Sequence, residues 1–132
     1  MDMPRRNNDG DLYNTKQTLE RKLAQIDGMN DISPHNKTKI FEFNRFCATN
    51  GIGGARTLRY LHDLAKLAKL IDKDFEAASR TDIEDVIHKI ESSYYSPRTK
   101  LDFKATVKRF YKWINGNEEY PESVRWIKTG AR

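Results

Sequence analysis

The segment 96–113, SPRTKLDFKATVKRFYKW, constrains the fold most, because it predicts a single helix with two unlike faces. Ser96 can cap this helix, and Pro97 suits its first turn, where a missing N–H costs nothing. One face carries apolar side chains at i, i+4, i+7 and i+11, namely Phe103, Val107, Phe110 and Ile114. This spacing is typical of a helix that packs against a core. The segment therefore predicts a helical domain built around this helix.

The opposite face of the same predicted helix is cationic. Between residues 96 and 116 the chain has six Lys or Arg residues and a single acid, Asp102. The cations are Arg98, Lys100, Lys104, Lys108, Arg109 and Lys112. Solvated helix faces usually mix both signs and gain i,i+4 ion pairs, whereas these lysines repel one another. A face of one sign suits a polyanion, and nucleic acid is the first candidate.

The rest of the chain also predicts helices. Besides 96–116, we expect helices over 14–26, 33–50, 55–71 and from Thr81 onward. The signals are apolar residues at helical spacing, capping residues and terminating glycines. The one that begins at Thr81 opens with Thr81-Asp-Ile-Glu84, which matches a capping box. Because no stretch alternates with the period of a strand, we expect an all-α fold, a compact bundle of four to five helices.

The two ends of the chain differ from this middle part. Residues 1–13 are polar and are expected to be disordered. Residues 14–116 are expected to form one helical domain, and residues 117–132, which contain Pro121, an extended tail.

The predicted helix 55–71 carries a second basic stripe. Its members recur at i, i+3, i+7, i+10 and i+14, with Arg56 near their edge: Arg59, His62, Lys66, Lys69 and Lys73. The formal net charge is +5 and the pI about 9.3, yet residues 74–95 carry six acids and only two bases. This segregation of charge favours a functional basic surface over a merely basic composition.

Other function classes find little support in the sequence. No apolar run approaches the roughly 18 residues of a membrane span, and the N-terminus lacks the apolar segment of a secretory signal. Cys47 is the only cysteine, so we expect a buried thiol and a cytoplasmic protein. The three histidines, His35, His62 and His88, lie on separate predicted helices without a second ligand nearby. We therefore expect no metal, no cofactor, no small-molecule substrate and no membrane partner.

Three passages, taken in order, resemble a known DNA-binding module. Thr57-Leu-Arg-Tyr60 followed by Asp63-Leu64 is similar to the module's "T-L-x-x-Y-x-x-D-L" helix, with Tyr60 one position early. Thr81-Asp-Ile-Glu84 is similar to the start of its third helix, and the segment 96–113 to its last helix. The module is the N-terminal core-binding (SAM-like) domain of tyrosine recombinases, the phage integrase and Xer class, archaeal members in particular. The resemblance covers residues 32–128.

The resemblance implies a DNA-binding domain without chemistry of its own. In that family a separate catalytic domain supplies an Arg, a His-x-x-Arg and a nucleophilic Tyr. No His of this chain is followed by Arg at i+3, so we expect it to bind duplex DNA without cutting it. We therefore assign no catalytic residues, and expect 117–132 to be a linker toward an absent catalytic domain. Self-association on DNA is expected of the full-length protein.

The family's second and fourth helices enter the major groove, and here they correspond to 55–71 and 96–115. These are the two helices that already displayed basic stripes. The residues expected to contact DNA are Arg56, Thr57, Arg59, Lys66, Lys69, Arg98, Thr99, Lys100, Lys104 and Lys108. The alternative is an all-α protein-interaction module whose basic faces bind an acidic protein partner.

Overall fold

A computed structural model describes residues 8–130, with side chains from residue 14 onward. The elements are α1 (Asn8–Asp27), α2 (Pro34–Thr49), α3 (Gly54–Ile71), the 3₁₀ helix η1 (Phe75–Ala77), α4 (Arg80–Glu91), α5 (Pro97–Ile114) and α6 (Glu122–Arg125). No strand occurs within 8–130, which confirms the predicted all-α class. The count exceeds the expected four to five α-helices because the tail forms α6.

Helices α2, α3 and α5 begin within one residue of their predicted positions. Ser96 caps α5, since its Oγ accepts the Thr99 N–H at 3.1 Å, and Pro97 is the first helical residue. Ser33 caps α2 in the same way, accepting the Asn36 N–H at 3.1 Å. These side chains satisfy backbone donors that the first helical turn leaves unpaired, which explains why the prediction was accurate there.

Helix α4 begins earlier than predicted. Its N-cap is Ser79 rather than Thr81, and the capping box joins Ser79 to Asp82. The Asp82 N–H donates to Ser79 Oγ at 3.2 Å, and the Ser79 N–H donates back to Asp82 Oδ2 at 2.9 Å. Lys73 also donates to this carboxylate at 2.9 Å. Two capping boxes were possible, one beginning at Ser79 and one at Thr81. The structure uses the one at Ser79, whose Asp82 also accepts a hydrogen bond from Lys73, outside the helix.

Helix α3 is the central element of the bundle. It contributes nine buried residues: Thr57, Tyr60, Leu61, Asp63, Leu64, Ala65, Leu67, Ala68 and Ile71. Aromatic rings from α2, η1 and α5 complete the core, with Phe43 and Phe75 centred 5.4 and 4.7 Å from Phe110. Cys47 is buried in this core, as predicted.

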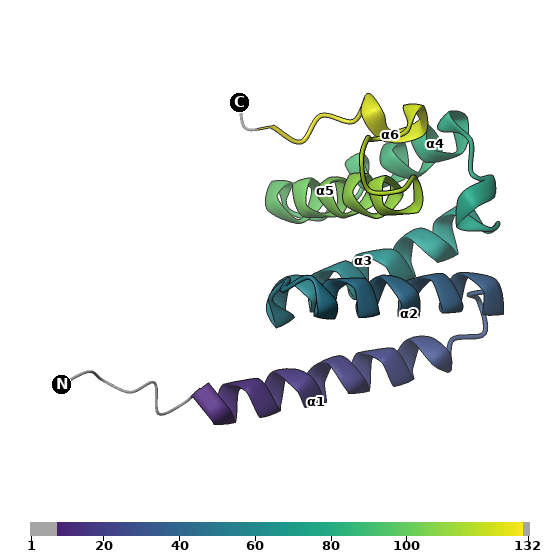
Figure 1. The fold of residues 1–132 in the computed structure, drawn as a ribbon. Coiled ribbons are helices and arrows are strands. Elements are labelled where there is room, and N and C mark those ends of the chain that lie inside the picture. Colours follow the sequence, from purple (N-terminus) through teal and green to yellow (C-terminus); the bar gives the residue numbers. More distant parts are fainter. Residues whose placement is uncertain (1–7, 131–132) are drawn as a thin grey trace.

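Helix α1 covers one side of the bundle and packs mainly across α3 (Figure 1). It begins at Asn8 rather than at Asn14, so residues 8–13 of the segment expected to be disordered are helical. Residues 1–7 of that segment lie outside the described part of the chain. The approach of α1 is close at Gly54, where an added Cβ would lie 2.1 Å from Thr15 Cγ2. Glycine at this position leaves room for the Thr15 side chain of α1.

The C-terminal tail folds back onto the bundle, so the expectation of an extended tail is wrong for residues 121–127. Val124 and Ile127 are 0% and 2% exposed and pack near α4 and α5. Arg80 at the start of α4 donates to Glu122 at 3.0 Å. The tail therefore belongs to the folded domain.

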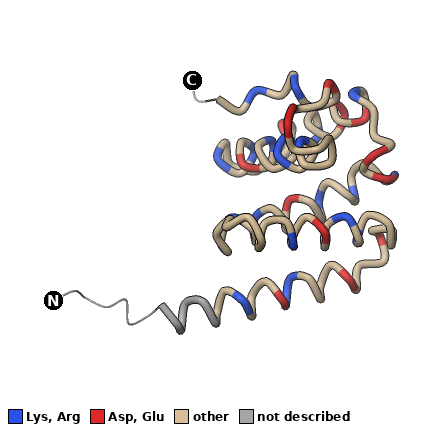
Figure 2. Tube along the Cα trace, viewed as in Figure 1, with Lys and Arg blue, Asp and Glu red and all other residues tan. Residues whose placement is uncertain are grey.

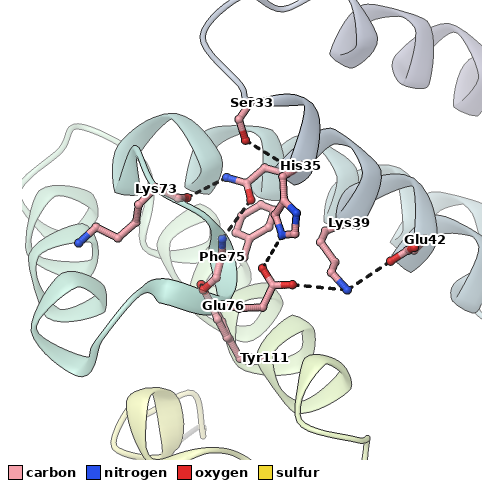
Figure 3. Close-up of polar contacts among 9 residues, drawn as sticks. Ser33, His35, Lys39, Glu42, Lys73, Phe75, Glu76 and Tyr111 are labelled. Carbon is pink, nitrogen blue, oxygen red and sulfur yellow. Dashed lines mark hydrogen bonds and ion pairs between the residues drawn. The ribbon is translucent and has the colours of Figure 1, made fainter.

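A polar network joins the start of α2 to the segment that links α3 and α4 (Figure 3). The buried Asn36 side chain donates to the Lys73 carbonyl at 2.8 Å and accepts the Phe75 N–H at 3.0 Å. Tyr111 of α5 donates to the Phe75 carbonyl at 2.7 Å. His35 bonds Glu76 at 2.8 Å, and this contact raises the pKa of the His35 imidazole. These bonds satisfy buried backbone groups and hold the α3–α4 connection in place.

None of the described helices is both long and apolar enough to cross a bilayer.

Candidate nucleic-acid interface

The N-terminal ends of α3 and α5 lie side by side at one end of the bundle (Figure 1). Asp102 of α5 joins them, since its two carboxylate oxygens lie 3.9 Å from Arg59 Nε and 3.4 Å from Arg98 Nε. One turn further on, Thr106 of α5 donates to the buried Asp63 carboxylate of α3 at 2.8 Å. The buried Thr106–Asp63 hydrogen bond holds the two helices together, and the more exposed Asp102 pairs lie beside it.

This end of the bundle presents more positive than negative charge. The side chains of Arg98 and Arg59 are 81% and 40% exposed, and both share Asp102. Arg56 is exposed and makes no hydrogen bond or ion pair with any described residue. Two guanidinium groups thus share one carboxylate, and a third has no partner among the described residues, next to the positive ends of two helix dipoles. We call this surface, made of Arg56, Arg59, Arg98, Thr99 and Asp102, the α3–α5 end.

A second group of basic residues lies on α3 and α1, whose Lys and Arg positions are coloured blue along the Cα trace in Figure 2. It consists of Lys22 from α1 and His62, Lys66 and Lys69 from α3, and we call it the α1–α3 cluster. Lys22 Nζ lies 3.4 Å from His62 Nδ1. Partial burial lowers the pKa of Lys22, and the charge of Lys69 lowers it further. The predicted stripe therefore places Lys66 and Lys69 close enough to Lys22 and His62 for their positive charges to disfavour protonation of His62.

Two of these lysines also have other neighbours. Lys66 Nζ lies 4.0 Å from the centroid of the Tyr95 ring, a cation–π contact that leaves its charge unneutralised. Lys69 Nζ lies 3.9 Å from an Asp31 oxygen, at the outer limit of an ion pair, and both side chains are well exposed. Such a surface pair contributes little stability, so Lys69 can exchange Asp31 for another anion.

Thr57 is unsuited to the predicted contact with DNA. Its side chain is buried, and its hydroxyl donates to the Gly53 carbonyl at 3.0 Å. Thr57 also forms a side-chain hydrogen bond with the Cys47 thiol, whose pKa is raised, chiefly by burial. The residue stabilises the junction of α2 and α3 from inside.

The lysine stripe of α5 does not form the free cationic face that the sequence predicted. Lys100 donates to the Glu91 carbonyl at 2.8 Å, and Lys104, only 17% exposed, bonds the Glu91 carboxylate. Lys108 donates to the Ile127 carbonyl at 3.0 Å. Glu91 ends α4 and Ile127 belongs to the folded tail, so these lysines fasten α5 to its neighbours. Thr99, by contrast, is exposed, and its hydroxyl accepts from Ser96 at 3.0 Å.

Sequence reasoning missed Lys22 and the two tyrosines before α5. Lys22 comes within reach of His62 only because α1 packs across α3, 40 positions away in the sequence. Tyr95 is exposed beside Lys66, and Tyr94 is fully exposed. The only sequence signal for these tyrosines was that they are adjacent, and adjacency does not distinguish a buried tyrosine from an exposed one.

Other kinds of site are not evident in the described residues. No group of three or more His, Cys, Asp or Glu side chains within 8–130 is arranged to hold a metal ion. The Tyr111 hydroxyl is buried against a carbonyl, and burial raises its pKa.

Comparisons with known proteins add no family assignment: no family model, no curated protein and no solved structure matches this chain.

Proposed function

We propose that this chain binds duplex DNA through the α3–α5 end and the α1–α3 cluster, as the core-binding domain of a tyrosine recombinase does. The observation that carries the proposal is the meeting of two helix N-termini, where Arg59 and Arg98 share the Asp102 carboxylate and exposed Arg56 has no partner among the described residues. Backbone phosphates of DNA supply the missing negative charge, and helix N-termini are favourable positions for phosphate.

The same geometry suits the major groove. The groove is about 12 Å wide and admits a helix, and arginines in its first turns can reach both phosphates and guanine edges. Arg98 extends furthest into solvent, whereas Arg59 is held closer to the helices by Asp102. In this proposal Lys100, Lys104 and Lys108 act indirectly, by holding α5 against α4 and the tail. The chain binds and does not cleave.

The proposal is tested by fluorescence anisotropy with a random-sequence duplex of about 30 base pairs across a range of salt concentrations. We expect log affinity to fall linearly with log salt, with a slope of about 0.9 per neutralised phosphate. Arg56→Glu combined with Arg98→Glu should lower the affinity for duplex about tenfold or more. It should also reduce the slope of log affinity against log salt by about 1.8, the value for two phosphate contacts.

A charge-matched variant serves as control. Lys89→Glu combined with Lys128→Glu makes the same change in net charge at exposed positions of α4 and the tail, where neither lysine has a partner among the described residues. This control should retain nearly wild-type affinity. Equal losses in both variants would mean attraction by net charge alone. Absence of duplex binding even at low salt would favour the acidic protein partner instead.

A further inference from the structure

The α1–α3 cluster contains an unusual contact between two basic groups. Lys22 Nζ lies 3.4 Å from His62 Nδ1, so the ammonium donates and the imidazole nitrogen accepts. This contact requires Nδ1 of His62 to be unprotonated. Protonation of His62 would place two positive charges in contact and remove the acceptor. The arrangement therefore holds only while His62 is neutral.

The surroundings of His62 add further positive charge. Lys22 faces it from α1, and Lys66 and Lys69 from α3. Arg59, about one turn before His62 on α3, lines an open depression of about 460 Å³ together with Lys22 and His62. Among the carboxylates of this region, Asp102 pairs with Arg59 and Arg98, and buried Asp63 accepts from Thr106. Exposed Asp31 lies 3.9 Å from Lys69 of the cluster itself.

We propose that Lys22 and His62 form a phosphate-binding site shared by α1 and α3, which takes a backbone phosphate of bound duplex DNA while the His62 ring takes up one proton from solvent. The inference rests on the proposed function and extends it. It makes α1 part of the interface, although α1 lies outside the resemblance to the core-binding domain. A phosphate placed between the two side chains accepts a charge-assisted hydrogen bond from each and offsets their positive charge, whereas a neutral acceptor would leave that charge uncompensated.

The direction of the pH dependence follows from the charges. The pKa of His62 lies below its ordinary value, first because of partial burial and then because of Lys22, Lys66 and Lys69. A bound phosphate offsets that positive charge and raises the pKa of His62 in the complex. The added affinity is fully present below the pKa of the free protein and is lost as the pH rises through the pKa of the complex.

The experiment has two arms. In the first, NMR follows the His62 ring through a pH titration of the full chain, with and without tripolyphosphate. We expect tripolyphosphate to raise the pKa of His62 by about one unit, which corresponds to about tenfold tighter binding at acidic than at alkaline pH. Lys22→Gln should abolish most of this shift.

In the second arm, anisotropy measures duplex affinity at about pH 5.5 and about pH 8 for three proteins. Wild type should bind about tenfold more tightly at the lower pH, and His62→Gln should lose this difference. His88→Gln is the matched control, because His88 is an exposed histidine of α4 away from the α1–α3 cluster, and it should behave as wild type.

The outcomes separate the two proposals. A His62 pKa that tripolyphosphate leaves unchanged would overturn the phosphate site, whether or not DNA binds. A raised pKa with no duplex binding would support the phosphate site and remove the proposed function. If duplex binding by His62→Gln kept the pH dependence of wild type, His62 would not be the group that takes up the proton, and the phosphate site would likewise be overturned.

Discussion

Phe110 of α5 connects aromatic rings that come from α2, η1 and α5 itself. Its ring contacts Phe43 of α2, Phe75 of η1 and, within α5, Trp113, at centroid distances of 5.4, 4.7 and 5.8 Å. It is fully buried, as its place in the α5 stripe predicted. Because these neighbours belong to separate helices, they cannot close over the space that a smaller side chain would leave.

We expect Phe110→Ala to lower the free energy of unfolding by about 3–5 kcal/mol, the usual cost of removing a buried aromatic ring. Ile114→Ala on the same helix is the control, since Ile114 is only half-buried and should cost less. Urea denaturation followed by circular dichroism measures both. Equal effects of the two substitutions would show that the aromatic cluster contributes no more than the edge of the core.

At the same scale, charge was harder to predict than burial. The apolar stripes gave the correct core positions for Phe103, Val107 and Phe110. The periodic lysines of α5 had the predicted helical phase but not the predicted exposure, because a lysine stem can lie along a neighbour while its ammonium finds an acceptor. Lys104 is the clearest case, with Glu91 as its partner.

Among the elements, the tail departs most from its predicted role. Local sequence suggested an extended tail because Pro121 and the polar residues around it disfavour a long helix. The short helix α6 instead turns Val124 and Ile127 into the core beside α4. Lys108 of α5 then bonds the Ile127 carbonyl. An element this short is stabilised by packing rather than by its own propensity.

Removal of residues 117–132 should therefore destabilise the domain. Burial of one Val or Ile contributes about 1.5–3 kcal/mol, so the truncation should cost several kcal/mol and lower the melting temperature. Removal of residues 129–132 alone should have little effect, because the two buried side chains remain. Calorimetry on the three lengths compares them. A chain ending at Gly116 that melts like the full chain would show that the tail packs without stabilising.

Across the whole molecule, stability should be unevenly distributed. Helix α3 packs against α1, α2, α4 and α5 and supplies nine buried residues. In the described part of α1, by contrast, Ile26 alone is fully buried, while Leu19 and Leu23 are half-buried. Local opening of α1 exposes less apolar surface than opening of α3, so it requires less free energy.

Native-state hydrogen exchange tests this distribution. We expect the central amides of α3 and α5 to exchange only by global unfolding, and those of α1 to exchange earlier, through local opening. The tail amides near Val124 should resemble α4, against which they pack. Amides of α1 as protected as those of α3 would contradict the expectation and make α1 an integral part of the core.

The sequence by itself determined the helical class, the bounds of α2, α3 and α5, and the core-facing stripes, because these depend on the helical period and on capping within a few residues. Only the tertiary structure decided which cations remain available. Lys104 and Lys108 found partners in α4 and the tail, whereas Lys22 joined His62 across 40 positions. The charge balance of a surface depends on which distant elements meet there. Helical periodicity reports only on neighbours within one helix, so it cannot predict those contacts.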